Sequence, residues 1–207
     1  MRIVLITGYK RMGKDYLTNN GLQGYIILKH PNSRKVLPKI EKCEKLKLAY
    51  SLRTLLDGFF GFKIDDQDYD EFKDSKDFLP VKGSIRDYFI SIGKATKDID
   101  KEFFVKVLDR QLEEYYHNET VSISDWRYQE EYDYLSAKHD VITVRVHRSY
   151  DEFDQEIDIA SVNDDSEHSL DQHEVDFILV PRNTTYKYSM LDVYKIFPWS
   201  IKYNRVD

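Results

Sequence analysis

The chain begins with an apolar stretch, residues 2–7, that runs directly into the glycine-containing loop GYKRMGKD of residues 8–15. This loop has the spacing G-x-x-x-x-G-K, and residues 15–20 after it have the character of a helix that Gly21 should end. A strand, a loop of this spacing and a helix together surround an anion with backbone N–H groups and the positive end of the helix dipole. The sequence therefore predicts an α/β protein whose first loop binds phosphate.

The residue types in this loop suit a nucleoside triphosphate. Gly8 and Gly13 leave out a Cβ that would obstruct the turn or the phosphates, and Lys14 is expected to reach the β- and γ-phosphates. Asp15 stands where most such loops carry a Ser or Thr hydroxyl that ligates magnesium, and its carboxylate can serve Mg²⁺ directly or through a water. The predicted ATP-binding residues here are Gly8, Lys10, Met12, Gly13, Lys14, Asp15 and Tyr16.

Short apolar runs alternate with helical patterns along the rest of the chain. Strands are expected near residues 25–28, 45–50, 121–124, 141–146 and 175–180, and helices over 51–60, 85–92, 101–108 and 130–138. Ser84 and Asp100 are suited to cap two of these helices. The alternation favours a central, mainly parallel sheet flanked by helices. We expect one domain over residues 1–207, in which the acid-rich, poorly periodic segment of about 148–173 is a mobile lid.

The composition narrows the class of function. With 41% hydrophobic residues in a chain of 207, there is enough apolar material for one compact core. The net charge of -6 argues against DNA or RNA as the main partner, although a local basic pocket can still bind a small anion. A single cysteine, Cys43, cannot form an internal disulfide, and no apolar run is long enough for a membrane span. We expect a soluble protein of a reducing compartment, the cytoplasm.

Several segments, taken in order, resemble one enzyme family. The loop GYKRMGKD resembles the G-x-x-x-x-G-K-D loop of the deoxynucleoside monophosphate kinases of phages and viruses, and equally that of the animal-type phosphomevalonate kinase. SDWRYQEE at residues 124–131 resembles the family signature S-D-x-R-[FY] with following acids. Weaker similarities lie at residues 47–53, where Arg53 replaces the usual Lys, and at residues 85–93, 166–171 and 176–179. The set spans nearly the whole chain.

The resemblance implies a three-layer P-loop kinase fold and transfer of the γ-phosphate of ATP to a deoxynucleoside monophosphate, with Mg²⁺. Such a transfer requires cations around two anionic substrates. Asp125, expected at the carboxyl end of a strand, would hold magnesium together with Asp15, unless it caps the following helix. Arg127 would hold the acceptor phosphate with forked hydrogen bonds, and an ion pair with Asp125 or Glu131 would not exclude that role.

The other expected substrate contacts come from separate segments. Arg53 and Arg86 lie early in helices and are assigned to the acceptor phosphate, although exposed helical arginines are common. Trp126 is a candidate to stack on the acceptor base, and the resemblance places Arg182 and Asn183 at the donor adenine. Residues expected to act in catalysis are Lys14, Arg11, Asp15, Arg127 and Arg148, the last as an arm at the hinge of the lid.

Three questions stay open at the level of the sequence. The acceptor could be phosphomevalonate instead of a nucleotide, although the S-D-x-R-Y-x-E-E string favours the nucleotide. A nucleotide-binding switch without catalysis is a further alternative, which the basic residues expected at several strand ends disfavour. Phage-type members of the family often pair, so the resemblance allows a homodimer, and a viral origin would place the protein in the host cytoplasm.

Overall fold

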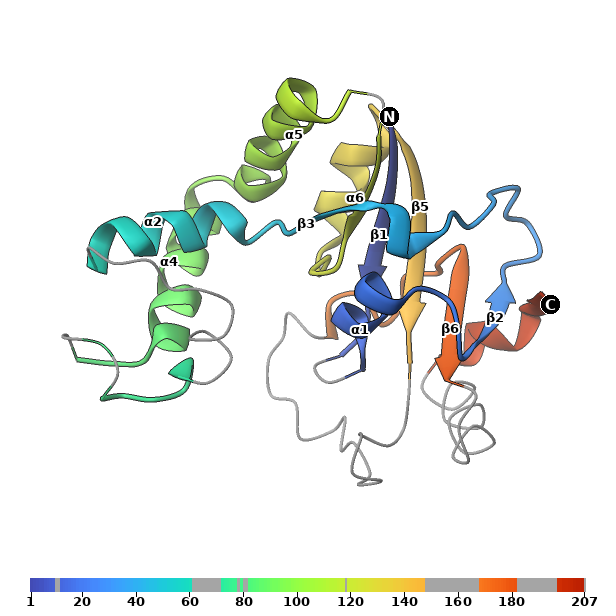
Figure 1. The fold of residues 1–207 in the computed structure, drawn as a ribbon, viewed down its shortest axis with the longest axis horizontal. Helices are drawn as coiled ribbons and strands as arrows, with labels where there is room; N and C mark the ends of the chain where they lie inside the picture. Colours follow the sequence, from blue (N-terminus) through green and yellow to red (C-terminus); the bar gives the residue numbers. More distant parts are fainter. Residues whose placement is uncertain are drawn as a thin grey trace. The chain divides into compact units, whose positions relative to one another are not determined.

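The computed structural model describes residues 1–9, 12–60, 72–77, 79, 82–117, 119–147, 168–181 and 197–206. The chain groups into two compact units, one formed by Met1–Leu46 with Tyr116–Asp207 and the other by Lys47–Tyr115. The first unit contains the β-sheet and the second contains helices α2, α4 and α5 (Figure 1). The expectation of one domain over residues 1–207 stays a prediction.

The sheet of the first unit has seven strands in the order β3-β4-β1-β5-β6-β2-β7. Their bounds are β1 Arg2–Thr7, β2 Tyr25–Lys29, β3 Glu44–Leu46, β4 Thr120–Ile123, β5 Asp140–Val146, β6 Phe177–Pro181 and β7 Asn204–Val206. Strands β3, β4, β1, β5 and β6 are parallel, whereas β2 pairs antiparallel with both β6 and β7. The predicted α/β class is confirmed, with a mixed sheet whose central part is parallel.

Strand β1 lies in the middle of the parallel part because its side chains are apolar on both faces. Ile3, Val4, Leu5 and Ile6 are all fully buried, as expected for a strand covered on each side. Its register pairs Leu5 with Ile123 of β4 and with Thr143 of β5. The carboxyl ends of β4 and β5 therefore flank the point where β1 enters the glycine loop.

The helices of this unit are short. Helix α1 spans Lys14–Asn20 and helix α6 spans Gln129–Ser136, both close to the predicted bounds. Helix α6 connects β4 to β5, two parallel strands that lie on opposite sides of β1. Two 3₁₀ turns, Ile40–Lys42 and Pro198–Lys202, complete the described secondary structure of the unit.

The second unit is built from α2 (Tyr50–Phe60), α4 (Ile85–Ile99) and α5 (Phe103–Tyr115). Helix α4 begins as the sequence predicts: the Ser84 hydroxyl accepts a hydrogen bond from the Asp87 N–H at 3.2 Å, and the Asp87 carboxylate accepts one from the Ser84 N–H at 2.9 Å. The predicted strand at residues 45–50 is wrong beyond Leu46, because β3 ends there and α2 begins at Tyr50.

The predicted lid stays a prediction. Residues 148–167 lie outside the described part of the chain, whereas residues 168–173 are described and contact the sheet-containing unit. Leu170 is only 2% exposed, and its carbonyl accepts a hydrogen bond from the Arg145 guanidinium. The Asp171 carbonyl accepts another from the Trp199 indole at 3.1 Å. These backbone contacts could not be predicted from the acid-rich composition of the segment.

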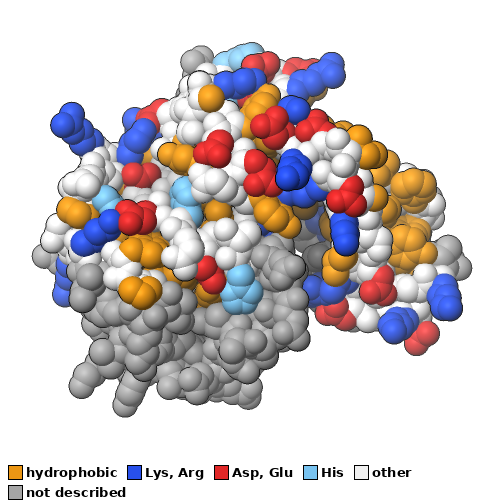
Figure 2. Space-filling view, turned by 180° about the vertical axis from the view of Figure 1, so that it is seen from behind, with side chains coloured by type: hydrophobic (Ala, Val, Ile, Leu, Met, Phe, Trp, Pro, Cys, Tyr) orange, Lys and Arg blue, Asp and Glu red, His pale blue; other side chains and the backbone are white. Residues whose placement is uncertain are grey.

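Two surface properties bear on partners. None of the helices in the described ranges has both the length and the apolar character that crossing a bilayer requires. In the face that Figure 2 presents, acidic and basic side chains lie next to one another over the described residues. Nucleic-acid-binding proteins favour a surface on which basic side chains gather.

Candidate functional site

The glycine loop leaves β1 at the centre of the parallel strands. β4 lies on one side of β1 and β5, the next strand in the chain, lies on the other. The chain therefore changes the side of β1 on which it adds parallel strands. Ligands of open α/β sheets bind outside the carboxyl ends of the strands at such a switch point. Figure 1 shows α1 directly after β1, at the end of the sheet where that strand points. The predicted phosphate-binding loop therefore lies where this architecture places a ligand.

The two glycines of the loop are needed for different reasons. Gly8 has a φ of 145°, and a Cβ at this position would lie 2.4 Å from the carbonyl oxygen of Val146, the last residue of β5. Gly13 caps α1 in a left-handed conformation with a φ of 89°, while a Cβ there would approach no atom closer than the Tyr25 hydroxyl at 3.5 Å. Gly8 allows close contact with β5, and Gly13 allows the turn into the helix.

The side chain of Lys14 folds back over the loop. Its ammonium donates hydrogen bonds to the carbonyl oxygens of Gly8 and Tyr9, the second at 2.9 Å. These acceptors are neutral, whereas a phosphate oxygen is a charged acceptor and forms a stronger bond with an ammonium. Lys14 therefore lies beside the loop backbone, within reach of an anion that the loop would hold.

Asp15 meets the end of strand β4. The Ser124 hydroxyl donates a hydrogen bond to the Asp15 carboxylate at 3.2 Å, and Ser124 is 6% exposed. Asp125 is the next residue, so the two carboxylates predicted to hold magnesium come from adjoining segments at one edge of the sheet. Carboxylate and hydroxyl oxygens are ligands that Mg²⁺ accepts.

A metal ion held by protein side chains alone would need several ligands close together. Within the described residues, no three His, Cys, Asp or Glu side chains gather as a group that could hold an ion. Magnesium at phosphoryl-transfer sites needs fewer protein ligands, because phosphate oxygens and water fill most of its shell. Asp15 and Ser124 fit that kind of site.

Glu131 has a structural role at the start of α6. Its buried carboxylate accepts hydrogen bonds from the N–H groups of Arg127 and Tyr128, both at 3.1 Å. Glu131 thus satisfies N–H groups at the helix start, and the cap residue of α6 is Tyr128. Asp125 is therefore not the cap residue of this helix. Its role at the magnesium ion stays a prediction.

Trp126, the candidate to stack on an acceptor base, is enclosed by its neighbours, and its stacking role stays a prediction. Trp126 is 1% exposed, and its indole N–H donates to the Tyr128 carbonyl at 2.8 Å. The ring of His173 packs edge-on against it, with centroids 5.0 Å apart. A base could reach the indole only by displacing these neighbours, so Trp126 is a core residue.

The predicted arginines come from both units and from residues outside the described part of the chain. Arg127 is half-buried, and its backbone is held by Glu131 and by Ser169, whose hydroxyl donates to the Arg127 carbonyl. Arg53 and Arg86 belong to the other unit, where the Arg86 guanidinium pairs with Asp74. Their assignment to the acceptor stays a prediction. The predicted site residues Lys10, Arg11, Arg148, Arg182 and Asn183 lie outside the described residues.

Sequence reasoning missed a polar cluster beside the loop. Arg145 of β5 is 2% exposed, and its burial lowers its pKa to about 10, although Tyr9 and Asp171 favour the charged form. The Tyr9 hydroxyl donates to Asp171 at 2.6 Å. The one signal in the sequence is the arginine inside the apolar run VITVRV, since a charged residue in a buried strand needs partners.

A separate hollow lies away from this loop. It measures about 380 Å³, and its walls include Glu44 at the start of β3 and Thr120 at the start of β4. Both residues are at the amino ends of their strands, whereas the loop follows the carboxyl end of β1. The hollow is therefore not part of the candidate site.

Comparison with known proteins adds no identification. A scan against protein-family models finds no match to this chain, and a search of curated proteins finds no similar sequence. The resemblance to the kinase family therefore depends on the residues of this chain alone.

Proposed function

We propose that this protein binds ATP at the loop of residues 8–15 and, with Mg²⁺, transfers the γ-phosphate to a deoxynucleoside monophosphate. The observation that carries the proposal is the position of Lys14. Its ammonium lies against the carbonyls of a glycine loop that joins a buried central strand to a helix. The loop follows β1 at the switch point of the sheet, the position that ligands of α/β proteins use.

The reaction demands little covalent chemistry from the protein. The acceptor phosphate oxygen is already ionised near neutral pH, because its second pKa is about 6, so no general base is required. Catalysis comes from alignment of the two substrates and from compensation of their charge. Lys14 would stabilise the phosphate tail of ATP. Magnesium, when bound, neutralises the phosphate oxygens, and Asp15 with Ser124 would hold its ligand shell.

Phosphomevalonate is the second candidate acceptor, since the loop resembles both kinase types equally. The residues of the SDWRYQEE segment favour the nucleotide. The described structure adds that Ser124 contacts Asp15. That contact links the segment to the loop, but it would serve either acceptor.

An ATP-consumption assay tests the proposal. The purified protein is offered the four deoxynucleoside monophosphates, the ribonucleoside monophosphates and phosphomevalonate in parallel, and product formation is measured for each. We expect turnover with one or more deoxynucleotides. Turnover with phosphomevalonate alone would select the second acceptor, and ATP binding without any product would favour a nucleotide-binding switch.

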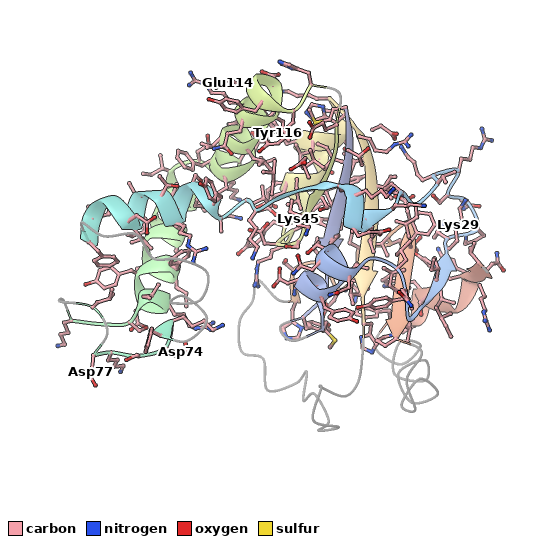
Figure 3. The ribbon with its side chains drawn as sticks, in the orientation of Figure 1. Lys29, Lys45, Asp74, Asp77, Glu114 and Tyr116 are labelled. Carbon is pink, nitrogen blue, oxygen red and sulfur yellow. The ribbon has the colours of Figure 1, made fainter. Side chains whose placement is uncertain are left out.

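Lys14→Ala gives the matched test of the loop. Removal of one group that stabilises the transition state costs about 100-fold or more in rate. The control is Lys45→Ala. Lys45 is labelled in Figure 3, and its ammonium donates a hydrogen bond to Asn19 of α1 at 2.9 Å. Equal rates for the two variants would remove Lys14 from the mechanism.

A further inference from the structure

Tyr9 joins the phosphate-binding loop to a distant part of the chain. Its side chain is 2% exposed, and its hydroxyl donates to the Asp171 carboxylate at 2.6 Å. Its own backbone carbonyl accepts a hydrogen bond from the Lys14 ammonium at 2.9 Å. One residue therefore contacts the loop lysine through its backbone and the segment before β6 through its side chain.

Asp171 is itself firmly held. The His168 ring nitrogen Nδ1 lies 3.0 Å from its second carboxylate oxygen, and the Arg145 guanidinium lies 3.9 Å from the first. Arg145 is in turn fixed by the Leu170 carbonyl and lies over the Phe197 ring, 4.3 Å from its centroid. The acceptor that Tyr9 uses therefore has a defined position and a nearby positive charge.

We infer that Asp171 is a positioning residue for the phosphate-binding loop and acts through Tyr9. As far as ATP is concerned, this inference rests on the proposed function. When an anion draws the Lys14 ammonium away from the carbonyls of Gly8 and Tyr9, the loop loses two hydrogen bonds that hold it. The bond between Tyr9 and Asp171 does not involve Lys14, so it keeps the loop backbone in place while the ligand binds.

The physical effect is preorganisation. A loop that already holds its N–H groups in the binding arrangement loses less conformational freedom when it takes up a ligand. A hydrogen bond between a hydroxyl and a carboxylate is charge-assisted and stronger than a neutral one. Breaking it should therefore weaken nucleotide binding more than it weakens the fold.

Three variants and one control separate positioning from simple stability. Tyr9→Phe removes only the hydroxyl and keeps the ring. Asp171→Asn keeps an oxygen that can accept the Tyr9 hydrogen bond but loses the charge, whereas Asp171→Ala removes the acceptor. The control is Tyr203→Phe, which deletes a buried hydroxyl of the same unit, one bonded to the N–H of Val175 at 3.1 Å and to the carbonyl of Val175.

ATP affinity is measured by titration calorimetry, and amide hydrogen exchange of residues 8–14 is measured without nucleotide. We expect Tyr9→Phe and Asp171→Ala to raise the Kd for ATP about tenfold, the effect of one hydrogen bond to a charged group. The Asp171→Asn value should lie between theirs and that of the unchanged protein. Loop exchange should become faster in the same order. Tyr203→Phe should lower the melting temperature and leave both loop readouts unchanged.

The readouts distinguish failure of this inference from failure of the proposed function. If Tyr9→Phe leaves loop exchange and ATP affinity unchanged, or if Tyr203→Phe changes them as much, Asp171 has no positioning role. If the unchanged protein does not bind ATP but Tyr9→Phe still speeds loop exchange, the positioning role stands and the kinase proposal fails.

Discussion

Gly8→Ala tests whether close contact with β5 fixes the glycine loop. The added methyl group would lie 2.4 Å from the carbonyl oxygen of Val146, and the φ of 145° at Gly8 is one that L residues rarely adopt. That carbonyl is backbone at the end of β5, so it cannot rotate away as a side chain can. Gly24 supplies the matched control, because its φ is 84° and a Cβ there would meet no atom within 4 Å.

The two glycines differ in what their replacement costs. A left-handed backbone costs an alanine about 1–2 kcal/mol, partly offset by about 0.4–1 kcal/mol from the smaller entropy of the unfolded chain. We therefore expect Gly24→Ala to lower the free energy of unfolding by about 1 kcal/mol. At Gly8 the backbone shift that relieves the overlap adds about 1–3 kcal/mol, as in overpacked cores, for a total of about 3 kcal/mol.

Urea unfolding followed by circular dichroism measures this difference. Both glycines belong to the sheet-containing unit, so the comparison holds even if the two units unfold separately. With an m-value of about 2 kcal/mol/M, the midpoint should fall by about 1.5 M for Gly8→Ala and about 0.5 M for Gly24→Ala. Equal midpoints for the two variants would refute the argument that β5 restricts the loop, and Gly8 would then be required for its backbone conformation alone.

Two further predictions concern Glu131, which is buried, and His173, which is half-buried. Glu131→Ala should lower the free energy of unfolding by about 1–2 kcal/mol, because two N–H groups at the start of α6 lose their acceptor. The control Glu130→Ala, in the same helical turn, should have little effect. Thermal unfolding of both variants checks this. Burial and then the charge of Arg145 lower the pKa of His173, so the native state binds fewer protons than the unfolded chain. Stability should therefore fall as the pH drops below about 6.5, and urea midpoints between pH 7.5 and 5.5 should fall less in His173→Gln.

The fold class was predictable because the strongest sequence signals came from buried strands. The apolar run of residues 3–6 and the strand at 141–146 are where the sequence places them, and Ser84 caps α4 as expected. The antiparallel pairing of β2 was not predictable, since strand direction depends on partners that are distant in sequence. On α2, Leu55 and Phe59 share a helical spacing with buried Leu52 and Leu56, yet they are 47% and 69% exposed.

The candidate site was predictable only where its residues are adjacent in the chain. Gly8, Gly13 and Lys14 are read from one loop, and their spacing implies their geometry. The contact of Tyr9 with Asp171 joins residues 162 positions apart, so no local pattern reveals it. The burial of Trp126 was missed for the same reason. Its neighbour His173 comes from a segment that was expected to be mobile from its composition.

Asp15 shows how a departure from a motif is understood only in three dimensions. In the sequence, its carboxylate replaces a hydroxyl and adds negative charge beside the expected phosphates. In the structure, the Ser124 hydroxyl at the end of β4 donates a hydrogen bond to that carboxylate, so the two groups lie side by side. The hydroxyl absent from position 15 is therefore present nearby, supplied by the residue that follows β4. A motif counts residues along one segment, whereas a magnesium shell depends only on which oxygens lie within reach.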